Sequence, residues 1–334
     1  MDMGQFEGPN RRRALEKRSM RKALVVGIND YPGAPLRGCV NDALAISNVL
    51  ETHGDGGPNF AVRLLTSPPE AMTRSRLREE VETLFAGDPD VALFYFSGHG
   101  TVNSFGGYIV TTDFKRYDDG VSMDEILTIA NRSKAKDKVL LLDSCHSGAF
   151  GSPMTTGSNV AQLSEGLSVL TASHSSESAL EINGSGVFTA LVVNALQGGA
   201  ADLRGHVTPG SIYAYVDQAL GAWDQRPIFK TNVTRFTSLR TIAPPVPLGT
   251  LRKLLDYFPT PQDEHKLDPS YEFTEAIAAP AHVAIMKDLQ KFVSVGLVVP
   301  VGEEHMYFAA MNSKSCRLTA LGFQYWRMVK DKLI

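Results

Sequence analysis

Apolar residues along the first two thirds of the chain fall into short continuous runs separated by longer amphipathic stretches. The runs have the length of strands buried on both faces, and they lie at 23–28, 61–65, 91–96, 138–142 and 167–171. In the stretches between them, apolar residues recur three or four positions apart, which is typical of amphipathic helices. This alternation predicts an α/β fold with a mostly parallel sheet flanked by helices.

Several predicted helices carry recognisable end signals. Ser122 followed by Glu125 predicts a capping box. Thr208-Pro209 predicts an N-cap with proline in the first turn, and Gly198-Gly199 predicts the end of a helix over 187–197.

A proline-rich segment divides the chain, and we assign 243–250 as a linker. Beyond it, the patterns predict helices at 251–258, 281–295 and 318–333, and strands at 297–301 and 306–311 around a Gly302-Glu303-Glu304 turn. Helices followed by a hairpin are typical of a winged-helix-like module. We therefore expect residues 251–334 to form a small α+β domain for regulation or interaction.

The first 22 residues differ from the rest in charge. They carry seven basic and three acidic residues, a net charge of +4, whereas the whole chain has a net charge of −3. We predict a peripheral basic arm over 1–22, followed by the α/β domain over 23–242.

Composition narrows the function class. The chain has 334 residues, 43% of them hydrophobic and 21% charged, which fits about two folded domains. Its charge balance argues against nucleic-acid binding, and no apolar run approaches the ~18 residues of a membrane helix. Three cysteines cannot form a disulfide framework in a chain of this size, and no secretory leader is visible. We expect a cytoplasmic protein with reduced thiols.

Two motifs carry candidate chemistry, and each directly follows a predicted buried strand. They are Ser-Gly-His-Gly at 97–100 and Asp-Ser-Cys-His at 143–146. Because the carboxyl ends of parallel strands meet at one edge of a sheet, we expect His99 and Cys145 to lie close together. A thiol beside an imidazole is suited to nucleophilic catalysis, since an imidazolium stabilises the thiolate.

Together with neighbouring segments, these motifs resemble the caspase-like peptidase domain over residues 22–240. The resemblance is to its metacaspase and paracaspase branch, of bacterial type. His99 and Cys145 are 46 positions apart, near the ~50-residue spacing of caspase-type peptidases. Further segments resembling the family are the first strand at 23–29, the Gly-Cys-Val-Asn-Asp-Ala helix start at 38–43, and the later positions 171–173 and 186–189.

The resemblance implies a Cys-His mechanism. His99 takes the proton of Cys145, and the thiolate attacks a peptide carbonyl. The oxyanion then binds backbone N–H groups, which the resemblance places at Gly100 and Cys145. It also implies that a backbone carbonyl orients the imidazole.

The resemblance further implies an S1 pocket lined by Asp42, Ser97, Asp143 and Glu181. Carboxylates around one slot attract a basic P1 side chain and repel an acidic one, and the planar fork of Arg suits paired carboxylates. Two alternatives remain open: Asp42 as the N-cap of its helix, and Glu181 as a solvated turn residue.

A cofactor is not expected from the motifs, but the resemblance leaves calcium open. Asp113, Asp118 and Asp119, together with Asp124, form a candidate acidic cluster. Ser152, however, occupies a position where the family's pattern has an aspartate ligand.

We therefore predict a cysteine endopeptidase that cleaves protein or peptide substrates after Arg or Lys, in a signalling or defence role. No Lys or Arg occurs in 148–167, so self-cleavage there is not expected. We expect activation to be allosteric or to depend on another protease instead, with 251–334 as the regulatory module that an activator or regulator protein binds. The alternatives are a catalytically silent caspase-fold scaffold and a regulator that binds DNA through 248–334.

Overall fold

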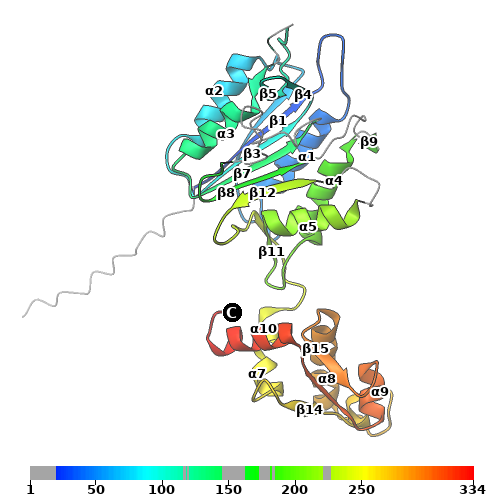
Figure 1. Cartoon of the computed structure of the whole chain (residues 1–334). Helices are drawn as coiled ribbons and strands as arrows, with labels where there is room; N and C mark the ends of the chain where they lie inside the picture. The colour runs from blue at the N-terminus through cyan, green and yellow to red at the C-terminus, as the bar shows by residue number, and fades with distance from the viewer. Residues whose placement is uncertain are drawn as a thin grey trace, which may run out of the picture.

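The computed structural model describes residues 20–115, 118, 120–144, 162–172, 181–182, 185–220 and 227–334. A six-stranded sheet forms the centre of the α/β part of the chain (Figure 1), in the order β12-β8-β7-β3-β1-β2. Its strands are β1 Arg21–Ile28, β2 Ala61–Ser67, β3 Val91–Ser97, β7 Asp137–Asp143, β8 Leu167–Thr171 and β12 Ile228–Asn232. All neighbours run parallel except β12, which is antiparallel to β8. The mostly parallel sheet is thus confirmed.

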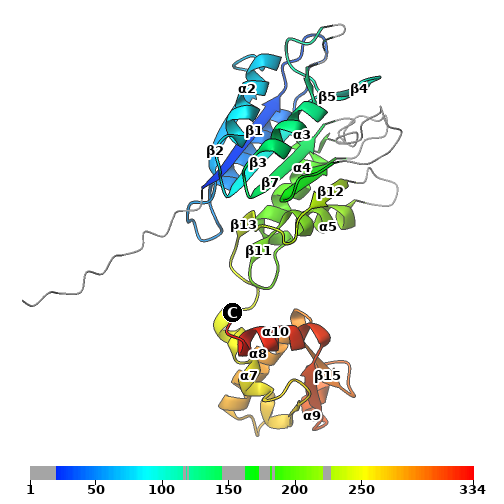
Figure 2. The same ribbon diagram turned by 60° about the vertical axis from the view of Figure 1, so that its left-hand side comes forward.

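Helices cover both faces of the sheet (Figure 2), and each face has its own apolar core. The first face is covered by α1 Cys39–Glu51, α4 Val187–Asn194 and α5 Pro209–Ala219, and the second by α2 Arg74–Phe85 and α3 Met123–Arg132. Successive strand residues alternate between the two cores, as Phe94 and Tyr95 do in β3. This double burial explains why the strands read as continuous apolar runs.

Among the described residues before the C-terminal unit, three small antiparallel sheets accompany the main one. The first contains β4 Gly100–Asn103, β5 Gly106–Ile109 and β6 Val121–Ser122, and it lies at the same end of the molecule as the carboxyl ends of the parallel strands (Figure 2). The others pair β9 Glu181–Ile182 with β10 Ser185–Gly186, and β11 His206–Val207 with β13 Arg240–Thr241.

The helix signals have mixed outcomes. The cap at Thr208 is confirmed, since its hydroxyl accepts from the amide of Ser211 and a reciprocal bond completes the box. The box at Ser122 is wrong: Ser122 makes no side-chain cap, and Glu125 instead pairs with Arg78 at 3.1 Å. Beyond α4, the chain continues as a π-helical turn, Ala195–Gly199. This turn contains both glycines that the sequence analysis places after the end of the helix.

The strand β1 begins earlier than the predicted arm boundary. Arg21, assigned from sequence to the basic arm, is a strand residue whose guanidinium lies 4.3 Å from the ring of Phe60 and donates to the carbonyls of Ser238 and Leu239. Residues 1–19 lie outside the described part of the chain.

The C-terminal residues form a unit with a separate core. Its elements are α6 Leu248–Arg252, α7 Leu254–Tyr257, β14 Glu264–Lys266, the 3₁₀ turn Pro269–Tyr271, α8 Pro280–Ser294, β15 Val298–Val301, α9 Met306–Met311, β16 Ser315–Leu318 and α10 Ala320–Lys330. The strands form one antiparallel sheet in the order β14-β16-β15. Helix α6 starts inside the predicted linker, which leaves only 243–247 as connection.

One predicted strand of this unit is wrong. Residues 306–311 form the helix α9, because Met306, Ala309 and Ala310 are buried at helical spacing. The partner of β15 is instead β16, Ser315–Leu318. An apolar run of six residues fits either period, so only packing decides between them. The winged-helix-like class stays a prediction.

Within the described residues, no helix combines the length and apolarity needed to cross a membrane.

Candidate functional site

The site lies where β3 and β7 end side by side. Ser97, the last residue of β3, pairs in register with Asp143, the last residue of β7. The backbone amide of Gly98 donates to the carbonyl of Asp143 at 3.2 Å, which joins the residue after β3 to the last residue of β7. Cys145 follows directly after the described Ser144 and lies, with His146, outside the described residues.

The His99 imidazole is held by backbone and by a tyrosine. Its Nε2 lies 2.8 Å from the carbonyl oxygen of Ala34. Since a carbonyl only accepts hydrogen bonds, Nε2 carries the ring hydrogen and Nδ1 keeps a lone pair for a proton. The His99 amide donates to the hydroxyl of Tyr31 at 3.0 Å, and the two rings are 4.6 Å apart. The Ala34 contact thus favours the neutral tautomer in which Nδ1 can accept a proton, and the Tyr31 contacts position the loop and the ring.

Gly98 is required by this packing. A Cβ there would overlap the Tyr31 hydroxyl and lie 2.6 Å from Cζ of Phe96. Only glycine lets the loop pass close enough for the Tyr31 hydroxyl to reach the His99 amide.

Asp42 is a buried carboxylate on α1, 2% exposed. Its Oδ2 accepts from Oγ of Ser97 at 3.1 Å, and its Oδ1 accepts from the amide of Gly186 at 3.1 Å. Burial, with the nearby charge of Asp143, raises the pKa of Asp42 to about 7, although these hydrogen bonds oppose the rise. The cap position of α1 belongs to Gly38, so the N-cap interpretation of Asp42 is wrong.

Asp143 is the second carboxylate, 8% exposed. Thr189 donates from Oγ1 to Asp143 Oδ2 at 2.6 Å, and the Tyr95 hydroxyl lies 2.6 Å from the same Oγ1. Burial raises the pKa of Asp143, with the Thr189 hydrogen bonds opposing. A Cβ on Gly186 would lie 2.8 Å from Oδ2 of Asp143 and 3.3 Å from Oδ2 of Asp42. The two carboxylates therefore flank one backbone position.

Comparison with known proteins decides the family. A family model described as the caspase domain matches residues 20–237. The chain belongs to the caspase-domain family.

Similar curated proteins are metacaspases. Metacaspase-9 of Arabidopsis thaliana is 33% identical over 148 residues, 39% of this chain and 44% of that protein. Metacaspase-1 of Candida glabrata is 32% identical over 149 residues, which are 38% of this chain and 37% of that protein. Metacaspase-1 of Mycosarcoma maydis is 30% identical over 160 residues, which are 42% of this chain and 39% of that protein. The matched segments thus span less than half of each relative.

The caspase domain brings together three of the predicted pocket residues, Asp42, Ser97 and Asp143, at the edge where His99 lies. The fourth predicted pocket residue, Glu181, pairs through its backbone with Gly186 in the β9–β10 ribbon. Its side chain is not among the described groups. Gly100 begins β4 directly after His99.

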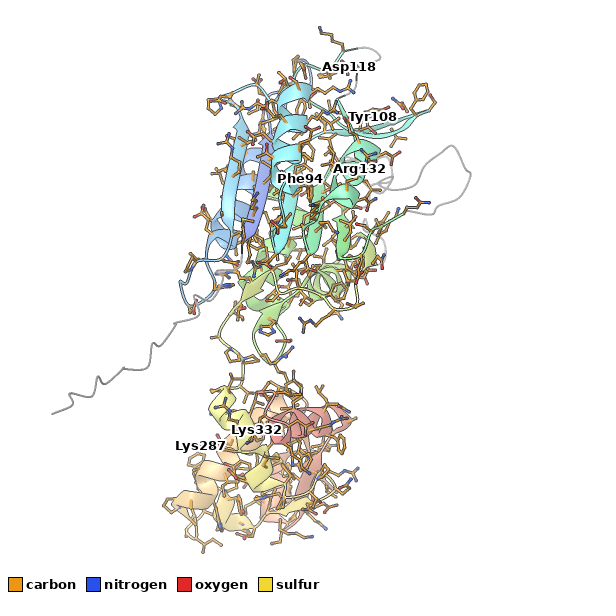
Figure 3. All side chains as sticks on the ribbon, turned by 90° about the vertical axis from the view of Figure 1, so that its left-hand side faces the viewer. Phe94, Tyr108, Asp118, Arg132, Lys287 and Lys332 are labelled. Atoms are coloured by element: carbon orange, nitrogen blue, oxygen red, sulfur yellow. The ribbon has the colours of Figure 1, made fainter. Side chains whose placement is uncertain are left out.

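Two of the candidate calcium ligands contact an arginine. Asp113 accepts from the backbone amide of Arg74 at 3.0 Å, and Asp118 pairs with the Arg74 guanidinium at 2.8 Å. Asp118 lies at the carboxyl end of the sheet, like Tyr108 of β5 (Figure 3). Asp119 is outside the described residues, and the described ranges hold no group of three or more side chains suited to a metal ion.

Sequence reasoning missed several residues that support the site. Thr189 and Gly186 occur in a segment noted only for its family resemblance, and Tyr31 and Ala34 lie in the loop between β1 and α1, where no site residue was predicted. Their residue types carry no signal of their own, because a hydroxyl or a backbone group becomes functional only through its position.

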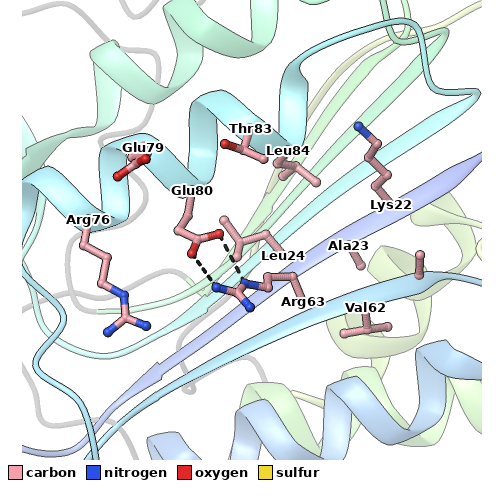
Figure 4. Close-up of a pocket in the computed structure, with 11 residues that line it drawn as sticks. Lys22, Ala23, Leu24, Val62, Arg63, Arg76, Glu79, Glu80, Thr83 and Leu84 are labelled. Atoms are coloured by element: carbon pink, nitrogen blue, oxygen red, sulfur yellow. Dashed lines mark hydrogen bonds and ion pairs between the residues drawn. The ribbon is translucent and has the colours of Figure 1, made fainter.

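A separate pocket of about 680 Å³ lies at the opposite, amino-terminal end of the parallel strands (Figure 4). It is lined by the starts of β1 and β2 and by α2, and the Arg63–Glu80 ion pair of 2.9 Å crosses it. None of the sequence-predicted site residues lines this pocket.

Proposed function

We propose that this chain is a cysteine endopeptidase that cleaves peptide bonds after Arg or Lys. The observation that carries the proposal is the pair of buried carboxylates, Asp42 and Asp143, beside Gly186 at the edge where His99 lies. Membership of the caspase-domain family supports the peptidase chemistry.

A basic P1 side chain complements this pair electrostatically. Burial makes both carboxylates costly to ionise without a partner, which is the reason their pKa values are raised. A guanidinium between them restores the favourable charge balance and can form paired hydrogen bonds. An acidic P1 side chain would add a third negative charge to the buried carboxylates of Asp42 and Asp143.

The imidazole geometry supports the proposed proton transfers. With Nε2 committed to the carbonyl of Ala34, Nδ1 of His99 takes the proton of the Cys145 thiol. The thiolate attacks the P1 carbonyl, and the oxyanion accepts from the amides of Gly100 and Cys145. The protonated His99 then gives its proton to the leaving amine, and water hydrolyses the acyl-enzyme.

Fluorogenic peptides that end in Arg, Lys or Asp test the proposal on the full chain. We expect cleavage after Arg and Lys, and its loss in Cys145→Ala and in His99→Ala. Cleavage after Asp would overturn the pocket assignment, and unchanged cleavage by Cys145→Ala would overturn the nucleophile.

The same assay tests calcium dependence. Parallel reactions with calcium and with a chelator decide whether the acidic residues around Asp113 contribute. Asp113→Asn reports on this cluster separately from the S1 carboxylates, since Asp113 contacts Arg74 and Thr111 instead.

A further inference from the structure

Within the described part of the chain, strand β4 has one edge that no other strand pairs with, and β4 starts at the proposed oxyanion donor. The small sheet has the order β4-β5-β6, so β4 is an edge strand among the described residues. It begins at Gly100, immediately after His99, and runs to Asn103. An edge strand offers a row of backbone donors and acceptors to an extended peptide.

The register shows which backbone groups point outward. Gly100 is opposite Ile109, and the amide of Val110 donates to the carbonyl of His99 at 3.0 Å. In an antiparallel pair, hydrogen-bonded and non-hydrogen-bonded positions alternate. Thr101 and Asn103 therefore use their backbone groups toward β5. The N–H and C=O groups of Gly100 and Val102 point to the open edge.

The proposed proton transfer to the leaving amine indicates which part of a substrate lies along the open edge of β4. In the proposed mechanism, His99 protonates the leaving amine, so the segment after the scissile bond departs on the side of His99. Strand β4 continues directly from His99 and lies beyond the carboxyl ends of the main strands (Figure 2). The preceding part of the substrate lies at the carboxylates, on the side of β7.

We infer that the open edge of β4 binds the primed segment of the substrate, residues P1′ to P4′, as a parallel strand. This inference rests on the proposed peptidase function. In a parallel ladder, the Gly100 N–H donates to the P1 carbonyl, and its C=O accepts from the P2′ amide. Val102 N–H donates to the P2′ carbonyl, and its C=O accepts from the P4′ amide.

An exposed phenylalanine lies at the far end of this edge. Phe105 is 80% exposed, and its amide donates to Oδ1 of Asn103 at 2.7 Å, which fixes the turn between β4 and β5. The four residues of β4, at ~3.3 Å each, extend over about 13 Å, which is the length of four extended substrate residues. An apolar P4′ side chain would cover the ring of Phe105 and remove its apolar surface from water.

Internally quenched peptides test the inference. They share one unprimed sequence with Arg at P1 and carry one, two or four primed residues, with Leu at P4′ in the longest. We expect kcat/KM to rise about tenfold from one to four primed residues, since each net hydrogen bond contributes a factor of about 2 to 12. N-methylation of the P2′ amide should abolish the gain. N-methylation of the P3′ amide should not, because that amide faces away from β4.

Variants of the chain provide a second readout. Val102→Pro removes an outward N–H without removing a bond to β5, and proline is tolerated on edge strands. We expect it to lower the ratio of long-peptide to short-peptide kcat/KM several-fold. Phe105→Ala should lower the ratio for Leu at P4′, whereas Phe273→Ala, in the C-terminal unit and 74% exposed, should not.

The outcomes separate the two proposals. Cleavage of the shortest peptide with no gain from primed residues overturns this inference alone. Equal damage from N-methylation at P2′ and P3′ overturns the parallel register. A lack of cleavage of every peptide overturns the proposed peptidase function and this inference with it.

Discussion

The hydroxyl of Thr189 donates a hydrogen bond of 2.6 Å from its Oγ1 to Oδ2 of Asp143. The Tyr95 hydroxyl lies 2.6 Å from the same Oγ1, so the donor is itself oriented by a buried group. The carboxylate of the proposed S1 pocket thus depends on a residue 46 positions away in the chain.

Replacing this donor should weaken the pocket for a basic side chain. Thr189→Val keeps the shape but removes the hydroxyl, so the pKa of Asp143 should rise further. A hydrogen bond to a charged group contributes about 1.5–3 kcal/mol, so we expect kcat/KM for Arg peptides to fall roughly 10- to 100-fold. The control is Thr83→Val, at an exposed position of α2. Equal loss in both variants would contradict the role of Thr189.

Asp42 should make the stability of the protein depend on pH. Its pKa in the folded chain is about 7, above the ordinary 3.8, so the folded state binds a proton more readily than the unfolded state. Its contribution to stability is therefore greatest below about pH 4 and decreases as the pH rises through 7. Over the same range, the ionised form that attracts Arg becomes populated, so cleavage should increase with pH.

Urea unfolding at pH 4 and pH 8 measures this effect in Asp42→Asn. Relative to wild type, we expect the variant to gain roughly 1–4 kcal/mol in unfolding free energy between the two pH values. It should also lose most cleavage after Arg. The exposed Asp88→Asn is the control. A pH-independent difference between Asp42→Asn and wild type would show that Asp42 is ionised throughout.

Gly186→Ala should block the proposed S1 pocket beside Asp42 and Asp143. The added methyl group would lie 2.8 Å from Oδ2 of Asp143, closer than ordinary contact. We expect cleavage after Arg to fall at least about tenfold, because one carboxylate must move. Gly249→Ala, where an added methyl meets no atom within 4 Å, is the matched control. Retained cleavage in Gly186→Ala would place the P1 side chain elsewhere.

Thiol reactivity should single out Cys145. Cys316 is fully buried, and burial raises its pKa to about 12, so almost none of it is thiolate at neutral pH. Cys39 is 8% exposed. We expect iodoacetamide at pH 7.5 to add one carbamidomethyl group per native chain, seen by intact mass, and none to Cys145→Ala. Rapid modification of Cys316 would contradict its place in the core.

The five parallel strands of the main sheet and the edge where His99 lies could be predicted from the sequence because their signals are local. Strands β3 and β7 are buried on both faces, so their residues are continuously apolar, and each is followed at once by its motif. A parallel sheet then brings both motifs to one edge. The run at 306–311 shows the limit, since six apolar residues fit a strand and a helix equally well and the C-terminal core selected the helix.

Sequence alone determined the α/β class, the five parallel strands of the main sheet and the placement of His99 at a strand end, but it did not reveal the antiparallel strand β12. Only the tertiary structure decided which groups complete the site. The Gly186 amide reaches Asp42 across 144 positions, and the carbonyl of Ala34 reaches His99 across 65. Such contacts involve backbone groups that every residue possesses, so no residue type marks them. Packing of α1 and α4 on one face of the sheet brings the amide to the carboxylate, and that packing is a property of the whole fold.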